Sequence, residues 1–424
     1  MAKKTTSRRS SAGARPATAP KPDGGVVVSG TAQVDGDLVG RDKIIVIGSP
    51  PRREPAALPP EIATYVSWRQ KQPMGLSLIG VAGGDMPLGL DEVYVPLRLR
   101  SGLTSRPRPG KRAREAELEE YRENFELTDL FARIGGFRHA ILLGRAGTGK
   151  TTALKKLVQL CLPPTEKSPG TGPGTIDLPP GYVPLLVFLR RFTDADLDRP
   201  LTAFLRDELA SESRGELNDG TLDALFSREH GRLLVLLDGL DEIADPVRRT
   251  RFCEHLAQQL HEDACEHLRI VMTSRPAGHD PNAARLGKHF AAVSLEPLGP
   301  EQVPELVHRW FGEAARCLGD RYPRARATDH ATRLVDALTG SQFGRDLQVM
   351  FSTPLFLTLL CVIVQQGKAM PSSRAIFYQE CLHVLLERWH LGKDSEFGST
   401  EALRARGKER PETAEVHLSA AVAI

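Results

Sequence analysis

Strand-length runs of aliphatic residues alternate with longer amphipathic segments between Arg138 and about Leu295. Near-continuous aliphatic runs separated by helices are typical of parallel strands that are buried on both faces of a sheet. The pattern therefore predicts an α/β domain over residues 137–297, with a parallel five-stranded sheet flanked by helices. The five runs are His139–Leu143, Val183–Leu189, Leu233–Leu237, Arg269–Thr273 and Ala292–Leu295.

After Pro297 the apolar residues recur at helical spacing and strand-length runs are no longer found. We therefore expect an all-helical region over residues 298–395, followed by a tail over residues 396–424. The predicted helices are Glu301–Phe311, Thr328–Leu338, Pro354–Gln366 and Ser372–Trp389.

Three segments of different composition precede the α/β domain. Residues 1–24 are basic and rich in Ser, Ala, Pro and Gly, which is typical of a disordered tail. Residues 25–48 alternate short β-branched runs with Gly-Asp turns, which predicts a module of two or three short β-strands, although a linker would have a similar composition. Residues 49–60 form a proline-rich linker.

The region 61–136 is expected to be mixed and to lead into the α/β domain. A helix is predicted around Tyr65–Gln70, and an extended segment is predicted over LDEVYVPLRLR, where apolar positions alternate. The charged stretch Lys111–Asn124 is predicted to be helical because Glu and Arg recur four residues apart.

The charge of the chain is distributed unevenly. Residues 1–24 carry six basic residues and one acid, a net +5, so the remaining residues carry −2 of the chain's total of +3. The longest apolar runs are strand-length, well short of the roughly 18 residues that a transmembrane helix needs. We therefore expect a cytoplasmic protein with no membrane contact and no direct nucleic-acid binding.

The six cysteines contain no CxxC pair, which suits reduced thiols in a cytosolic protein. Cys253, His261, Cys265 and His267 lie close in sequence, but their spacing matches no zinc pattern. We expect structural or surface roles for these four residues.

The most specific motif in the chain is GRAGTGKTT, which follows the first predicted strand and opens a predicted helix, Thr152–Cys161. Its glycines let backbone N–H groups curl around a phosphate, the lysine reaches the β and γ oxygens, and the hydroxyl that follows can ligate Mg²⁺. This order of strand, loop and helix predicts a P-loop NTPase. The motif comprises Gly144, Arg145, Ala146, Gly147, Thr148, Gly149, Lys150, Thr151 and Thr152.

A second motif, RLLVLLDGLDE, places Asp238 at the carboxyl end of a buried strand, where open α/β sheets bind their ligands. Asp238 suits the Walker B role of holding Mg²⁺. Asp241 and Glu242 begin the next loop, and one of them is expected to orient or deprotonate the attacking water. The other is open to a purely structural role, such as capping a helix.

A third motif, LRIVMTSRPAG, places Arg275 just beyond another buried strand. A guanidinium at this position can contact a γ-phosphate and so distinguish ATP from ADP. A surface arginine in the turn before Pro276 is the alternative, and spacing does not decide between them.

These three motifs, in this order, resemble the NACHT family of signal-transduction NTPases, which belong to the STAND class. EVYVPLRLR, SLEPLGPEQVPELVHRWF and STPLFLTLLCVI also resemble segments of bacterial NACHT proteins. The resemblance implies ATP, ADP and Mg²⁺ as ligands, and a closed ADP form that opens and oligomerises with ATP. It also implies a helical lid, the start of a winged-helix region, and contact between Pro354 and the nucleotide base. Ser352-Thr353-Pro354 also fits an ordinary helix start with proline at its first position, and both can hold.

The repeat sensor that is usual in the family was not recognised in the sequence, nor was an N-terminal effector. We expect either a separate sensor or effector protein or a longer protein of which this chain is a fragment.

Three functions remain open from the sequence. The first is a slow regulatory ATPase in bacterial signalling or anti-phage defence. The second is a nucleotide-binding scaffold that does not hydrolyse ATP, and the third is an AAA-like ATPase that remodels DNA or protein.

Overall fold

The structure is a computed structural model, and it describes residues 58–72, 88–101, 124–134, 136–163, 178, 182–227, 232–261, 268–340 and 342–383. All of them belong to the second of the two units into which the chain divides, Ala57–Ile424. The predicted tails, the 25–48 β module, most of the linker 49–60, and Cys265 and His267 lie outside the described residues.

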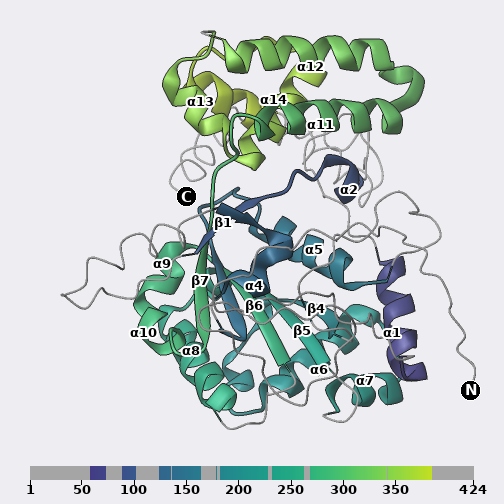
Figure 1. Ribbon diagram of the computed structural model, residues 1–424, viewed down its shortest axis with the longest axis vertical. Coiled ribbons are helices and arrows are strands. Elements are labelled where there is room, and N and C mark those ends of the chain that lie inside the picture. The colour runs from purple at the N-terminus through teal and green to yellow at the C-terminus, as the bar shows by residue number, and fades with distance from the viewer. Residues whose placement is uncertain are drawn as a thin grey trace, which may run out of the picture. The chain divides into compact units, whose positions relative to one another are not determined.

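The sheet has seven strands in the order β2-β1-β7-β3-β6-β5-β4. Figure 1 shows β7, β6, β5 and β4 following one another across the sheet. The five predicted strands are all present, and they pair in parallel as β7-β3-β6-β5-β4. Their bounds are β3 His139–Leu143, β4 Tyr182–Phe188, β5 Arg232–Asp238, β6 Leu268–Ser274 and β7 Phe290–Leu295.

Two short antiparallel strands extend the sheet beyond the five that the pattern predicts. β1 (Arg98–Ser101) pairs with β7, and β2 (Asn124–Glu126) pairs with β1. β1 lies at the end of the LDEVYVPLRLR segment that is predicted to be extended, but the first four residues of that segment, Leu90–Val93, form the short helix α2 instead. Asn124, predicted to end a helix, begins β2 instead; residues 111–123 lie outside the described part. Strands of three or four residues are too short to produce a recognisable alternation.

Helices cover both faces of the sheet. Along β5, Leu234 and Leu236 belong to one apolar cluster, while Leu233, Val235 and Leu237 belong to another, as expected when successive side chains point to opposite faces. The first cluster includes α4 (Leu130–Arg133) and α5 (Lys150–Cys161). The second includes α1 (Pro60–Lys71), α6 (Leu201–Ser213), α7 (Asp219–Phe226), α8 (Pro246–His261) and α10 (Ala283–Leu286).

The edge strand β4 is covered by α1, which confirms the helix predicted around Tyr65–Gln70. The Tyr65 hydroxyl donates to the Pro184 carbonyl at 2.7 Å, and burial raises the pKa of this phenol. Proline is tolerated at this position because an edge strand has no further neighbour to which it must donate.

The region after β7 is helical, as predicted. Its helices are α11 (Gln302–Leu318), α12 (Arg324–Thr339), α13 (Arg345–Phe351) and α14 (Pro354–Gln365), and residues 374–383 are also helical. We refer to α11–α14 as the lid. α13 is not among the predicted helices. The winged-helix region stays a prediction.

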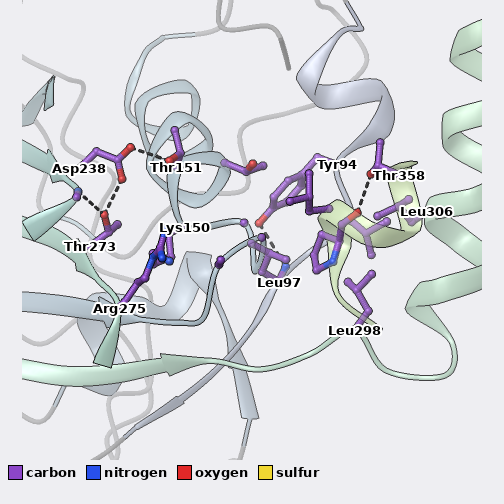
Figure 2. Close-up of a pocket in the computed structure, with 18 of the residues that line it drawn as sticks. Tyr94, Leu97, Lys150, Thr151, Asp238, Thr273, Arg275, Leu298, Leu306 and Thr358 are labelled. Atoms are coloured by element: carbon purple, nitrogen blue, oxygen red, sulfur yellow. Dashed lines mark hydrogen bonds between the residues drawn. The ribbon is translucent and has the colours of Figure 1, made fainter. Parts of the chain in front are cut away.

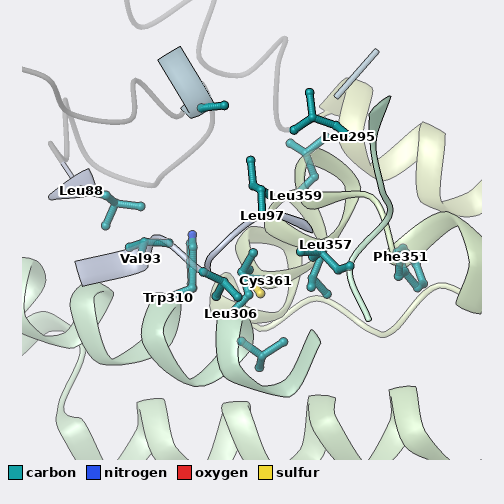
Figure 3. Packing of buried hydrophobic residues seen from close by; sticks show 14 of the residues in the cluster. Leu88, Val93, Leu97, Leu295, Leu306, Trp310, Phe351, Leu357, Leu359 and Cys361 are labelled. Atoms are coloured by element: carbon teal, nitrogen blue, oxygen red, sulfur yellow. The ribbon is translucent and has the colours of Figure 1, made fainter. Parts of the chain in front are cut away.

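The lid shares an apolar cluster with the first face of the sheet. Trp310 and Leu306 of α11 pack with Val93 of α2 (Leu90–Val93) and with Leu97 (Figure 3). α14 is apolar on all sides, which is typical of a helix buried within a larger fold.

No single helix among the described residues is long and apolar enough to span a membrane. α13 and α14 reach that length and apolarity only when taken together, and they are bent by 103° relative to each other.

Candidate functional site

The three motifs meet at one edge of the sheet. β3, β5 and β6 are parallel neighbours, so their carboxyl ends lie side by side, and each is followed by one of the motifs. The GRAGTGKTT loop joins β3 to α5, and Gly147 (φ +77°) and Gly149 (φ +91°) take the left-handed conformation that glycine permits. Gly149 is the residue that precedes the first turn of α5. The helix N-terminus therefore faces the loop, which is the arrangement of an anion site.

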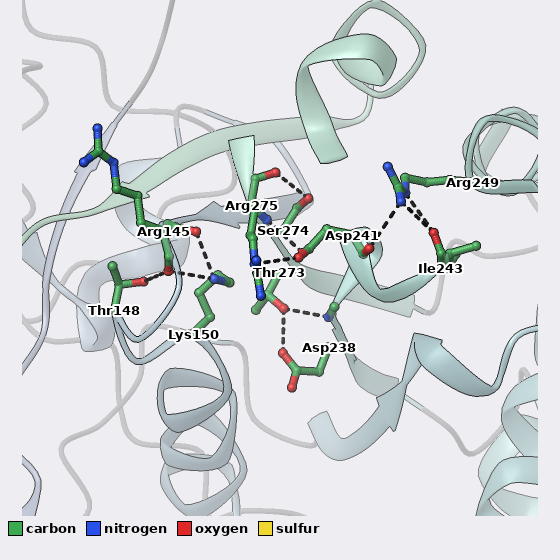
Figure 4. Close-up of polar contacts among 12 residues, drawn as sticks. Arg145, Thr148, Lys150, Asp238, Asp241, Ile243, Arg249, Thr273, Ser274 and Arg275 are labelled. Atoms are coloured by element: carbon green, nitrogen blue, oxygen red, sulfur yellow. Dashed lines mark hydrogen bonds and ion pairs between the residues drawn. The ribbon is translucent and has the colours of Figure 1, made fainter. Parts of the chain in front are cut away.

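Lys150 folds back over this loop. Its Nζ donates to the carbonyl oxygens of Gly144 at 2.9 Å and Arg145 at 3.0 Å (Figure 4). Burial lowers the pKa of Lys150; the Asp241 carboxylate opposes this effect, and the Arg275 guanidinium adds to it. Two cations thus lie close enough to repel each other, and an anion between them would relieve that repulsion.

Asp238 is held at both carboxylate oxygens. Thr151 Oγ1 donates to Oδ2 at 2.6 Å, and Thr273 Oγ1 donates to Oδ1 at 2.6 Å. The Gly239 amide in turn donates to Thr273 Oγ1 at 2.8 Å. Asp238 is 4% exposed, so these contacts satisfy a buried carboxylate.

The same residues fit a magnesium ion. The Thr151 hydroxyl and the Asp238 carboxylate are hard oxygen ligands of the kind that Mg²⁺ prefers, and they lie within hydrogen-bonding distance of each other. They come from the P-loop helix and from β5, as the sequence predicts. Thr273 was not predicted as a site residue from the sequence, although it stands two positions before Arg275 in the LRIVMTSRPAG motif.

Arg275 and Asp241 are brought together. The Arg275 backbone N–H donates to Asp241 Oδ1 at 2.9 Å, and its side-chain Nε lies 3.0 Å from Asp241 Oδ2. The pKa of the neighbouring Glu242 is raised, mainly by partial desolvation and to a smaller extent by the Asp238 carboxylate. Arg190 and Arg275 oppose this rise.

A cavity of about 490 Å³ joins these polar groups to an apolar region. Lys150, Thr151, Asp238 and Arg275 lie on one side of it, while Tyr94, Leu97, Leu298 and Leu306 lie on the other (Figure 2). The predicted residues that line it are Ala146, Gly147, Gly149, Lys150, Thr151, Thr152, Asp238, Asp241, Glu242, Arg275 and Pro354. The remaining loop residues, Gly144, Arg145 and Thr148, are not part of its lining.

Most residues on the apolar side of the cavity were not predicted as site residues from the sequence. Tyr94 lies in the EVYVPLRLR segment, its hydroxyl accepts from the Leu97 amide at 3.4 Å, and burial raises its pKa to about 12. Leu306 and Thr358 come from lid helices, and Leu298 from the segment that leads into the lid. Only Pro354 is anticipated, because residues that are distant in sequence and meet only in the fold leave no local pattern.

The lid touches the P-loop directly at this cavity. The Leu355 backbone N–H, in the first turn of α14, donates to the Gly147 carbonyl at 3.2 Å. A Cβ atom on Gly147 would lie 2.8 Å from Leu355 Cβ, so glycine is needed for this approach.

The family model of the NACHT domain matches residues 138–314, from the start of β3 into α11. Residues 138–314 are a NACHT domain. Together with the P-loop and the Walker B strand, this identifies a nucleotide-binding NTPase; nucleotide, usually with Mg²⁺, is what such a site implies. No protein of curated function matches the chain in sequence.

Three solved structures are distantly similar to the chain that contains this NACHT domain. Cdc6p from Pyrobaculum aerophilum is 15% identical with a TM-score of 0.34, over 62% of this chain and 65% of that protein. The Aeropyrum pernix ORC1 protein, solved in complex with DNA, is 16% identical with a TM-score of 0.30, over 68% and 70%.

The third, PCH-2 of C. elegans, is 16% identical with a TM-score of 0.31, over 62% and 67%. The chain thus spans just under two thirds of the length of the Pyrobaculum protein, at 65%. Likenesses this weak say nothing about what the NACHT domain binds or does.

Proposed function

We propose that this chain is a slow regulatory ATPase that binds ATP·Mg²⁺ and switches between a closed ADP form and an open, oligomerising ATP form. We place it in the cytoplasm, in bacterial signalling or anti-phage defence, working with a separate sensor or effector protein. The observation that carries the proposal is the two-sided cavity, which has phosphate-binding groups at one end and lid residues at the other.

The polar end of the cavity supports triphosphate binding. Lys150 and Arg275 supply the cationic side chains, and the loop glycines expose backbone N–H groups. Thr151 and Asp238 are the residues that would hold Mg²⁺, which would neutralise part of the charge on the phosphates when bound.

The apolar end supports a purine base. Its lining includes Pro354 and three buried leucines, Leu97, Leu298 and Leu306. Base rings bind well in such apolar surroundings. Adenine rather than guanine is the family's base, and GTPase-type guanine motifs were not found in the sequence.

Hydrolysis needs one acid of the loop after β5. In the proposed step a water oxygen attacks the γ-phosphorus, and its proton passes to a carboxylate, either Asp241 or Glu242. The bond from the γ-phosphorus to the bridging oxygen breaks, and ADP leaves with that electron pair.

Lid contact with the P-loop supports the switch. The hydrogen bond from Leu355 to Gly147 and the packing of Pro354 at the cavity tie the position of α14 to the loop that holds the phosphates. A ligand shifts such an equilibrium only if it binds the two forms with different affinity. A γ-phosphate close to the Leu355–Gly147 contact would give ATP and ADP different affinities for the closed and open forms.

The test combines binding, turnover and assembly in one set of samples. Wild type should bind fluorescent ATP and ADP analogues, hydrolyse ATP slowly, and elute as a larger species with ATP than with ADP. Lys150→Ala should lose nucleotide binding because the phosphates lose a charged contact. Lys71→Ala, on α1, is the matched control.

The results of these measurements distinguish the regulatory ATPase from the two alternative functions. Binding without turnover in wild type favours the non-hydrolysing scaffold, and turnover stimulated by DNA or a protein substrate favours a remodelling ATPase. Equal affinity of Lys150→Ala and wild type for ATP would show that the site is wrongly assigned.

A further inference from the structure

Two acids follow Asp238 in the loop after β5, and their surroundings differ. Asp241 accepts from the Arg275 backbone N–H at 2.9 Å and pairs with its Nε at 3.0 Å, and its side chain is 15% exposed. Within the described part of the chain, the Glu242 carboxylate has no hydrogen bond or ion pair, and Glu242 lines the cavity. The Asp241 carboxylate is therefore occupied by Arg275, whereas the Glu242 carboxylate is free to contact a ligand or a water molecule in the cavity.

The turn that carries Asp241 is anchored by two other segments, and Figure 4 shows the contacts made by Arg249. Arg249 Nη2 donates to the carbonyl oxygens of Asp241 at 3.2 Å and Ile243 at 2.7 Å. Gly278 comes so close that a Cβ atom there would lie 2.7 Å from Asp241 Cβ. The backbone is thus held from α8 and from the segment after β6, which keeps the carboxylate directed at Arg275.

We propose that Asp241 is a positioning residue that holds Arg275 in place, while Glu242 is the acid that acts on the attacking water. The inference rests on the proposed ATPase function and gives different roles to two acids that sequence spacing cannot separate. A role of Arg275 at the γ-phosphate belongs to the proposed function, and the inference adds how this arginine is held.

The geometry of the pair explains how Asp241 would act through Arg275. A guanidinium has five N–H donors, and the Asp241 contact uses Nε, the one nearest the chain. The terminal amino groups of a side chain held in this way are suited to reach phosphate oxygens. Because ADP has no γ-phosphate, a correctly held Arg275 should favour ATP, and loss of its support should reduce that preference.

A double-mutant cycle tests this coupling. Asp241→Asn, Arg275→Ala and the double variant are compared for the ratio of ATP to ADP affinity and for turnover. Each single variant should lower the ATP preference about tenfold, the size expected for one hydrogen bond to a charged group. The double variant should be no worse than Arg275→Ala alone. Asp241→Asn keeps side-chain size, and its thermal unfolding midpoint checks that it folds.

Asp194→Asn is the matched control. Asp194 forms a comparable pair with Arg248, at 2.8 Å and 2.9 Å, but neither residue lines the cavity. It should leave both the affinity ratio and turnover unchanged.

Glu242→Gln supplies the second arm of the test. It should lower turnover by roughly 10²–10⁴-fold, the usual loss of a general base, while the affinity ratio stays the same. Normal turnover in Glu242→Gln would overturn the role given to Glu242. Loss of turnover in Asp241→Asn beyond that of Arg275→Ala would show that Asp241 does more than hold Arg275, and would overturn its positioning role.

The result separates the inference from the function on which it rests. If Asp241→Asn lowers the affinity ratio equally in wild type and in Arg275→Ala, the two residues act independently, and the inference fails while the ATPase function stands. If wild type binds nucleotide without turnover, the ATPase function fails, and the affinity ratio alone decides whether Asp241 positions Arg275. If wild type binds no nucleotide, both fail.

Discussion

The Leu355 amide of the lid donates to the Gly147 carbonyl of the P-loop at 3.2 Å. This contact joins α14 to the phosphate-binding loop without any side-chain group, so its existence depends on how closely the two backbones approach. Thr353 also lies near, with its Cγ2 3.3 Å from the position of a Cβ on Gly147.

Gly147→Ala should therefore open the lid. The new methyl group would lie 2.8 Å from Leu355 Cβ, and the positive φ of +77° adds a backbone cost of about 1–2 kcal/mol. We expect faster release of an ADP analogue in stopped-flow fluorescence, together with a lower unfolding midpoint.

Gly215→Ala is the matched control for this variant. Gly215 has a similar φ of +83°, but no atom lies within 4 Å of its Cβ position. It should share the loss of stability and keep the wild-type release rate. Equal release rates in all three proteins would contradict the lid contact.

The grouping of residues at the polar half of the cavity could be predicted from sequence because its parts are local. The P-loop, Asp238 and Arg275 each follow a strongly aliphatic run, and the carboxyl ends of parallel strands meet at one edge. The strands could be recognised because a strand that is buried on both faces is aliphatic at consecutive positions. β5 is an example, since every residue from Leu233 to Leu237 is aliphatic.

The apolar half of the cavity and the different surroundings of the two acids could not be predicted in this way. Leu306 and Leu97 are brought to one cavity only by packing between the lid and the segment that leads into β1. Both stand in segments that resemble NACHT proteins, but neither belongs to one of the three motifs whose residue types indicate chemistry. Asp241 and Glu242 are adjacent in sequence, and only the contact with Arg275 distinguishes them.

Thr273→Val should weaken the site at Asp238. Valine keeps the shape of threonine but removes the donor to Asp238 Oδ1 and the acceptor for the Gly239 amide, at a fully buried position. Leaving two buried polar groups unsatisfied should cost about 1–3 kcal/mol in urea unfolding. Turnover should also need a higher Mg²⁺ concentration, because Asp238 is less firmly oriented.

Thr273→Ser restores the hydroxyl and should recover most of both effects. Thr332→Val, at an exposed position on α12, is the control for replacing a threonine hydroxyl with a methyl group. A Mg²⁺ dependence equal to that of wild type in Thr273→Val would show that Thr273 supports the fold but not the metal site.

The pH dependence of turnover should follow Glu242. Partial desolvation and Asp238 raise its pKa above the ordinary 4.5, with Asp241 adding to the rise, while Arg190 and Arg275 lower it. A base acts when it is deprotonated, so the rate falls as pH drops through this raised pKa. Removing a cation that favours the charged form raises the pKa further, so Arg190→Ala should move the acidic limb to higher pH.

Arg191→Ala is the neighbouring control, since Arg191 pairs with Glu208 at 3.2 Å instead. Its profile of rate against pH should match that of wild type. An acidic limb that stays in place in Arg190→Ala would mean that the titrating group is not Glu242.

Glu313→Gln should weaken the link between the lid and the segment before β1. Glu313 is 4% exposed, binds Arg316 through two contacts of 2.6 Å, and accepts from the Gly89 amide at 3.1 Å. Glutamine removes the charge but keeps one acceptor. Since Arg316 is 59% exposed, solvent screens the pair, and we expect a loss of about 1–2 kcal/mol at pH 7.

The effect of pH on stability provides the sharper measurement. Burial raises the pKa of Glu313, but hydrogen bonds from Arg316 and Gly89 outweigh it and hold the pKa below its ordinary 4.5. The contribution of Glu313 is therefore present above the unfolded pKa and is lost as pH falls through the folded value. The difference in unfolding free energy between wild type and Glu313→Gln should shrink as the pH falls below the ordinary pKa of 4.5.

Glu305→Gln controls for the loss of a glutamate on the same helix. Glu305 pairs with Arg309, and both side chains are 41% exposed, so this pair should contribute little at any pH. A pH-dependent difference of the same size in both variants would assign the effect to general charge on α11. A difference confined to Glu313→Gln assigns it to the buried contact with Gly89 and Arg316, through which α11 holds the segment that leads into Tyr94 and the cavity.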